Sequence, residues 1–345
     1  MSCSAHRFDL ADQWHIRSSA DLNAGGDVLS TSDVDSAEWL PAAVPSTVMA
    51  TLVQNGVYKD PYVGTNLREI PKEQFECPWW YRTEFTVSDD DAAGHVLLEF
   101  DGVNYSANIW LNGSCVATHD EVTGTYRQFQ FDVTKHIQPG KNVLAVEIIP
   151  PVPGDFSVGF VDWNPWPPDR NMGVFRSVRL RCHGGVSIER PFVQSDIDLD
   201  SLSEARLTVT AELVNRTGEP QTVTLRGIIG DIEFAQPVTL TDDQSQLVEF
   251  SPESFAQLTI QNPKLWWPNN LGEPSLHELT LEVVFDGRSS DRSETTFGIR
   301  DVQDYLNKDG HRGYRINGRD VLIKGGGWAD DLFLSDTPET LEAQV

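Results

Sequence analysis

Short runs in which apolar and polar side chains alternate, separated by turn residues, constrain the fold of this chain more than any other feature. Between Trp14 and Arg181 such runs occupy residues 80–87, 95–100, 107–111, 127–133, 142–149 and 174–181. Alternation with a period of two is typical of strands with one buried face, and Asn112-Gly113 is a tight-turn dipeptide. One short helix is expected between Ala42 and Gly56. The pattern favours a jelly roll or two-sheet sandwich over residues 1–184, and not an α/β fold.

A second all-β region is expected from about Gly185 to Arg300. Alternating runs at 205–213 and 221–225 flank the turn residues 215–218, and further strands are expected at 247–250, 258–260 and 276–285. Roughly seven strands in a segment of this size are typical of an immunoglobulin-like β-sandwich. We therefore predict such a sandwich over residues 185–300, although no cysteine pair supports membership of the true immunoglobulin class.

The last segment, residues 301–345, has a different pattern. Residues 314–324 predict a hairpin around Asn317-Gly318, which runs into three consecutive glycines and Trp328. Thr337 and Pro338 are the N-cap and first residue expected of a helix. A strand, a loop and a helix form the opening of a β/α unit, and one such unit cannot bury its own apolar side chains. We therefore expect the tail from about Asp320 to be the least stable part of the chain.

Composition excludes several classes of partner. The 345 residues include 26 Lys+Arg and 52 Asp+Glu, and the net charge of −26 repels phosphate backbones and anionic membrane surfaces, so neither nucleic acid nor a membrane is expected as a partner. The four cysteines lie far apart and the eight histidines show no metal-ligand spacing, so no metal, disulfide framework or cofactor is expected. The N-terminus lacks a signal-peptide pattern, which indicates a cytoplasmic protein, or a secreted one whose signal has been removed.

One segment fits neither a helix nor a strand. Residues 162–176, DWNPWPPDRNMGVFR, contain two tryptophans and three prolines between two predicted strands. Prolines fix φ and lower the cost of ordering a loop. Indole faces match the C–H face of a pyranose, and the neighbouring amide, carboxylate and guanidinium groups can bond sugar hydroxyls. The alternative is that both tryptophans only pack against another domain.

Four separated motifs carry a resemblance to glycoside hydrolase family 2. They are residues 162–165 with 171–176, residues 297–300, residues 316–325 and residues 78–85. The first and last of these most resemble the exo-β-D-glucosaminidase (exochitosanase) branch of that family, with the β-mannosidases as neighbours. The resemblance implies a jelly-roll sugar-binding domain, an immunoglobulin-like sandwich, and the truncated start of a (β/α)8 barrel at residues 301–345.

The resemblance also implies a function. It predicts the accessory half of an exo-acting retaining glycosidase that removes terminal β-linked glucosamine from chitosan-type oligosaccharides. β-Mannosidase or β-galactosidase activity, or a non-catalytic carbohydrate-binding module, remain alternatives. Retaining chemistry in this family uses two glutamates on later barrel strands, and no glutamate of this chain matches either motif. We therefore assign no catalytic residue, and expect the missing C-terminal barrel to be the natural intramolecular partner.

The resemblance also nominates substrate-binding residues. The loop of the sugar-binding domain supplies most of them, one further residue comes from a loop near residue 65, and three follow the first expected barrel strand. In chain order the candidates are Asn66, Asp162, Trp163, Asn164, Trp166, Asp169, Arg170, Asn171, Trp328, Asp330 and Asp331.

Overall fold

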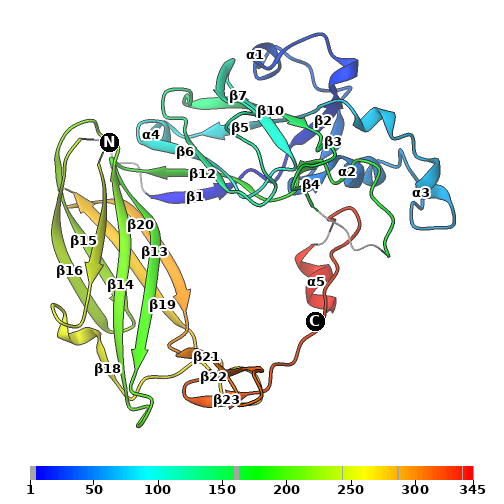
Figure 1. Cartoon of the computed structure of the whole chain (residues 1–345). Coiled ribbons are helices and arrows are strands. Elements are labelled where there is room, and N and C mark those ends of the chain that lie inside the picture. Colours follow the sequence, from blue (N-terminus) through cyan, green and yellow to red (C-terminus); the bar gives the residue numbers. More distant parts are fainter. Residues whose placement is uncertain (1–4, 159–162, 243, 286, 336, 345) are drawn as a thin grey trace. The chain divides into compact units, whose positions relative to one another are not determined.

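The computed structural model of the chain describes residues 5–158, 163–242, 244–285, 287–335 and 337–344. It divides into two compact units. The first unit contains residues 7–182 together with the described residues from Trp328 onward, and the second consists mainly of His183–Gly327. No helix in the described ranges is long and apolar enough to cross a membrane. The chain is mainly β, as the alternating runs predict (Figure 1).

The first unit is built on two main sheets (Figure 1). One sheet has the strand order β3 (Leu40–Ala42), β2 (Trp14–Ser18), β5 (Trp79–Val87), β10 (Gly140–Ile149), β7 (Ser106–Leu111) and β8 (Ser114–Ala117). The other has the order β1 (His6–Asp9), β12 (Val178–His183), β6 (His95–Phe100) and β9 (Phe129–Asp132). Six expected strands are found, and the predicted tight turn joins β7 to β8, where Asn112 and Gly113 both have positive φ.

A small two-stranded ladder positions the Trp-rich loop. Strand β11 (Gly173–Val174) pairs with β4 (Ser46–Thr47), so that Gly173 lies opposite Thr47 and Val174 opposite Ser46. Gly173 is required here, because a Cβ atom would lie 2.7 Å from the Ser46 carbonyl oxygen. The helix expected between Ala42 and Gly56 is α2 (Val48–Gln54), and it begins only after β4 has ended. The C-terminal end of the Trp-rich loop is therefore fixed beside the start of α2.

The remaining helices of the first unit are short. They are α1 (Gly26–Leu29), α3 (Asn66–Glu69), α4 (Asp89–Ala92), α5 (Pro338–Gln344) and the 3-10 turns Ser19–Asp21 and Glu73–Phe75. Helix α5 begins as the sequence predicts, since the Thr340 amide donates to the Thr337 hydroxyl at 3.2 Å.

The second unit is a pair of four-stranded sheets around one apolar core (Figure 1). The first sheet contains β13 (Val186–Ile197), β14 (Glu204–Asn215), β17 (Ser245–Phe250) and β18 (Thr259–Gln261), which follows the 3-10 turn Ala256–Leu258. The second contains β16 (Ile232–Leu240), β15 (Gln221–Ile229), β19 (His277–Phe285) and β20 (Arg288–Phe297). Inward residues such as Leu207 of β14 and Leu281 of β19 are fully buried, which is what holds the two sheets together.

A three-stranded sheet ends the second unit. It has the order β21 (Val302–Leu306), β22 (Arg312–Ile316) and β23 (Arg319–Val321), and the predicted hairpin turn is formed by Asn317 and Gly318, both with positive φ. The sequence predicts a strand through Lys324, but β23 ends at Val321. No strand among the described residues pairs with Leu322 and Ile323, and their side chains are 79% and 62% exposed.

Candidate functional site

Buried polar groups hold the Trp-rich loop in place. The Asn104 side chain donates from Nδ2 to the carbonyl oxygens of Arg170 and Asn171, both at 2.9 Å, and its Oδ1 accepts from the Thr125 hydroxyl at 2.7 Å. Asn104 is fully buried, so these bonds are shielded from competing water. The loop is thereby fixed to its neighbours through its own backbone, and its side chains do not have to supply that anchoring.

Asp169 anchors the same loop to α2. Its Oδ2 accepts from the Met49 amide at 2.8 Å and its Oδ1 from the Asn171 amide at 2.9 Å. The residue is 1% exposed. Burial raises the pKa of the Asp169 carboxyl to about 7, although the backbone hydrogen bonds oppose the rise. A carboxyl that is both buried and bonded in this way cannot reach a sugar, so the structure gives Asp169 an anchoring position.

Arg170 and Asn171 follow with left-handed backbones, at φ of 52° and 57°. Asn171 is fully buried, and neither its Oδ1 nor its Nδ2 has a hydrogen-bond partner among the described residues. Arg170 is exposed, and its Nη1 donates to the Pro151 carbonyl at 3.1 Å. The two neighbours therefore differ: Asn171 points into the protein, while Arg170 ties the loop to the proline-rich segment 150–153 and still faces solvent.

The two tryptophans of the loop are exposed. Trp163 is 75% and Trp166 is 59% exposed, Asn164 is partly buried, and Asp162 lies outside the described residues. By contrast, Pro167 and Pro168 are buried and form the base of the loop. Leaving two indoles in water forfeits the free energy that their burial would supply. Rings held in this way are free to receive a flat apolar partner.

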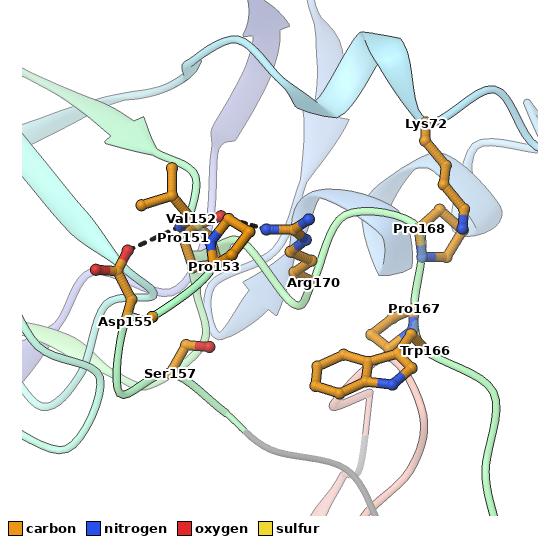
Figure 2. A pocket seen from close by; sticks show the side chains of 11 residues that line it. Lys72, Pro151, Val152, Pro153, Asp155, Ser157, Trp166, Pro167, Pro168 and Arg170 are labelled. Atoms are coloured by element: carbon orange, nitrogen blue, oxygen red, sulfur yellow. Dashed lines mark hydrogen bonds between the residues drawn. The ribbon is translucent and has the colours of Figure 1, made fainter. Parts of the chain in front are cut away.

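Trp166 and Arg170 line one pocket of about 430 Å³ (Figure 2). Lys72 lies at one end of it and Asp155 and Ser157 at the other, with prolines between them. The Asp155 carboxylate accepts from the Val152 amide at 2.8 Å. The pocket is lined by Lys72, Pro151, Val152, Pro153, Gly154, Asp155, Ser157, Trp166, Pro167, Pro168 and Arg170. Its size and its mixture of apolar walls with a few polar groups suit a small ring-shaped ligand.

Three of the remaining candidates, Trp328, Asp330 and Asp331, lie in the tail itself. Asp331 accepts from the Tyr62 hydroxyl at 3.0 Å through Oδ1, and from the Phe333 amide and Ser335 hydroxyl through Oδ2. Burial works to raise the pKa of Asp331, but these hydrogen bonds outweigh it and the pKa is lowered, so the carboxylate stays ionised. Asp331 therefore organises the tail, with its charge already satisfied by hydrogen-bond donors, which also include the Ser335 amide at 3.2 Å.

Phe333 fixes the tail to the first unit. It is 1% exposed, its ring lies 5.2 Å from that of Tyr62, and its carbonyl accepts from the Thr47 hydroxyl at 2.9 Å. Asn66 is exposed at the start of α3 and donates to the Asp60 carbonyl at 3.0 Å. Trp328 is 55% exposed, and Asp330 is also exposed.

The first turn of α2 joins both groups of candidates. Thr47, its N-cap, bonds the tail at Phe333, while the amide of Met49 bonds the Trp-rich loop at Asp169. The sequence predicts the helix but gives no sign of this double attachment. It also gives no sign of Lys72 or Tyr62, which are ordinary surface residues in sequence, although the proline run 150–153 could have indicated a rigid pocket wall.

Two family models match the chain. One, described as a glycosyl hydrolase 2 galactose-binding domain-like domain, matches residues 14–176, and the other, described as glycosyl hydrolases family 2, matches residues 186–300. The chain carries the N-terminal domains of glycoside hydrolase family 2. The resemblance found in the four sequence motifs is thereby confirmed.

Similar proteins place the chain within that family. It is 38% identical over 320 residues to an exo-beta-D-glucosaminidase of Streptomyces avermitilis, covering 92% of this chain and 35% of that relative. It is 31% identical to a mannosylglycoprotein endo-beta-mannosidase of Lilium longiflorum, of which it covers 37%. The crystal structure of the Amycolatopsis orientalis exo-chitosanase CsxA matches with a TM-score of 0.89 and 34% identity, over 96% of this chain and 38% of that one. The chain thus spans little more than a third of the length of these relatives.

Proposed function

We propose that this chain is the accessory N-terminal part of an exo-acting retaining glycosidase that removes terminal β-linked glucosamine from chitosan-type oligosaccharides. The observation that carries the proposal is the pair of exposed indoles on an anchored loop, in a chain 38% identical to an exo-beta-D-glucosaminidase. Anchoring through Asn104 and Asp169 sets the ring planes in advance, so binding a sugar does not have to order the loop.

The loop residues take different roles in this proposal. Trp163 and Trp166 offer ring faces to a pyranose, while Asn164 and Arg170 offer hydrogen-bond donors. Asp169 holds the loop, and Asn171 is buried behind it. Trp328 and Asp330 in the tail and Asn66 at the start of α3 are exposed and are proposed to line the same substrate path, with Asp331 fixing the tail backbone.

The catalytic step is assigned to a part of the enzyme beyond this chain. Retaining hydrolysis needs two carboxyl groups about 5 to 5.5 Å apart, one to protonate the leaving oxygen and one to attack the anomeric carbon. Of the acids in the loop and its pocket, Asp155 and Asp169 are both bonded to backbone amides, and Asp169 is buried. We propose domains at 1–184 and 185–300, with 301–345 opening a (β/α)8 barrel that would supply both glutamates. On its own the chain should hydrolyse no glycoside.

β-Mannosidase activity is the second candidate, because the Lilium longiflorum relative is 31% identical over 92% of this chain. β-Galactosidase activity and a stand-alone carbohydrate-binding module are further outcomes of the same test. In a β-mannosidase the same loop would contact the sugar, but that sugar bears a hydroxyl at C2, where glucosamine bears an ammonium.

A chimera tests the proposal. The aligned N-terminal part of the Streptomyces avermitilis relative is replaced by this chain. The p-nitrophenyl β-glucosaminide, β-mannoside and β-galactoside are then offered to the chimera as substrates, and the release of p-nitrophenol is measured. We expect hydrolysis of the β-glucosaminide, abolished by Trp163→Ala together with Trp166→Ala. A chimera that folds but acts equally well with both tryptophans removed would contradict the proposed role of the loop. Activity on the β-mannoside alone would favour the second candidate.

A further inference from the structure

The pocket beside Trp166 carries two cationic side chains in a chain whose net charge is −26. Lys72 enters from the residue before a 3-10 turn, and Arg170 from the Trp-rich loop (Figure 2). Within the described ranges, neither has a carboxylate within ion-pair distance, whereas Arg179, for example, is paired with both Asp9 and Asp101. A ligand group that carries an ammonium would meet like charge here.

Among the described residues that line this pocket Asp155 is the one carboxylate, and the adjoining pocket that shares Lys72 and Arg170 also takes in Glu76 and Asp169. Asp155 is partly buried and is bonded to the Val152 amide of its own turn, and Figure 2 shows it at the end of the pocket away from Lys72. The nearby Asp169 is buried, and its raised pKa of about 7 leaves it partly protonated near neutrality. Among the described residues that line this pocket, the two cationic side chains therefore outnumber the one carboxylate, that of Asp155.

The rest of the pocket wall is apolar. Four prolines, Val152 and the Trp166 indole present C–H and ring surface, which suits the face of a pyranose and a methyl group. Lys72, Arg170 and Ser157 offer donors, since Arg170 uses Nη1 on the Pro151 carbonyl and keeps its remaining N–H groups for other acceptors. A ligand that carries a hydrogen-bond acceptor beside a methyl group on an uncharged sugar ring therefore suits both the donors and the apolar surface of this pocket.

We propose that this pocket binds an N-acetylglucosamine unit of partially acetylated chitosan, in preference to a glucosamine unit. This inference rests on the proposed function and narrows its substrate class. The acetyl methyl packs against the prolines, the amide carbonyl accepts from Lys72 or Arg170, and the amide nitrogen carries no charge. The enzyme would then remove terminal glucosamine from chains that keep an N-acetylated unit in this pocket.

Binding to the chain tests the inference. The chain is titrated at low salt and mildly acidic pH with N,N′-diacetylchitobiose and with chitobiose, its free-amine form, and tryptophan fluorescence gives both dissociation constants. We expect the diacetylated sugar to bind about fivefold more tightly, the range that one exposed like-charge contact supplies. Added salt should bring the two dissociation constants closer together, because it screens the repulsion between like charges. Equal or tighter binding of chitobiose, or no binding of either sugar, would overturn the inference.

Variants sharpen the test. Lys72→Gln removes one charge but keeps a donor, so the ratio between the two sugars should shrink, mainly through tighter binding of chitobiose. Lys135→Gln, which removes an exposed lysine of the same unit outside the pocket, should leave the ratio unchanged. Trp166→Ala should weaken the binding of both sugars to the same extent. A ratio unaffected by Lys72→Gln contradicts the inference, and so does methyl β-D-glucuronide binding more tightly than the diacetylated sugar, because it would indicate an anion pocket.

The two proposals fail separately. If the chimera hydrolyses the β-glucosaminide while the chain shows no preference between the two sugars, only the pocket inference is wrong. If the chain keeps the preference while the chimera acts on the β-mannoside alone, only the assignment of the glucosaminidase activity is wrong.

Discussion

The Trp-rich loop and the C-terminal tail both expose large apolar side chains, but they are built in different ways. In the loop, Trp163 and Trp166 are exposed above a backbone that Asn104 and Asp169 hold with buried hydrogen bonds. In the tail, Leu322 and Ile323 are exposed on a stretch that belongs to no strand among the described residues. An exposed group on an anchored backbone is typical of a binding surface, while one on an unanchored stretch is typical of a segment that has not yet met its packing partner.

The described part of the tail is held at Asp331, which bonds Tyr62, and at Phe333, and removing the buried Phe333 ring should have the largest effect. Phe333→Ala deletes a fully buried ring that contacts Tyr62, and changes of this kind cost about 3 to 5 kcal/mol. We expect amide hydrogen exchange from Trp328 onward to rise strongly. Leu322→Ala, at a site 79% exposed, is the matched control and should leave exchange unchanged. Equal exchange in the two variants would mean that the tail is held by something other than Phe333.

The loop should respond to the loss of Asp169. Asp169→Ala leaves the amides of Met49 and Asn171 buried without an acceptor, and each unsatisfied donor costs about 1 to 3 kcal/mol. We expect a clear fall in the melting temperature of the first unit, with loss of order in the loop. The control is Asp155→Ala, which frees the single amide of Val152 in a partly exposed turn and should cost less. If both variants melted alike, the loop would not depend on Asp169.

The raised pKa of Asp169 makes the free energy of unfolding depend on pH. In the folded protein it titrates at about 7, and the ordinary value is 3.8, so the folded state binds the proton more tightly. Its contribution to the free energy of unfolding is therefore fully present below pH 3.8 and is lost as the pH rises towards about 7. Denaturation by urea across that window should show a steeper fall for the natural chain than for Asp169→Asn. Parallel curves for the two proteins would rule out this linkage.

The exposed stretch of the tail should tolerate polar substitution best. Leu322→Ser with Ile323→Ser changes side chains that are mostly in water, so the free energy of unfolding should change by no more than about 0.5 kcal/mol. Light scattering should show less self-association, because the apolar edge is gone. A large loss of stability would show that these residues are already packed. It would contradict the distinction between an anchored loop and an unanchored tail stretch.

Local patterns in the sequence predict most of the strands and little of the site. Strands with clean alternation, such as β14 and β19, follow from their residues. Three of the strands that were not foreseen break the pattern: β13 has Pro191 at a bulge, β16 contains Pro237, and β20 is almost entirely polar. These strands owe their existence to the neighbours they pair with, which no local window of sequence contains.

Prediction of the site from the sequence is limited in the same way, because contacts between distant residues decide it. The residue types in the loop predict which rings are available to a sugar, and Trp163 and Trp166 are indeed exposed. Whether a carboxylate faces solvent is decided by contacts between residues far apart in the chain. Asp169 bonds Met49, and Asp331 bonds Tyr62, so both carboxylates are engaged inside the protein. No spacing within the loop or the tail reveals those partners.

Trp163→Ala in the chimeric enzyme tests the central claim most directly. The account predicts that kcat/KM on the β-glucosaminide falls by about 5- to 150-fold, which corresponds to the loss of about 1 to 3 kcal/mol of transition-state binding. The melting temperature should stay unchanged, because the indole is 75% exposed. An unchanged kcat/KM with a lowered melting temperature would contradict it, and would show that Trp163 packs against the rest of the enzyme.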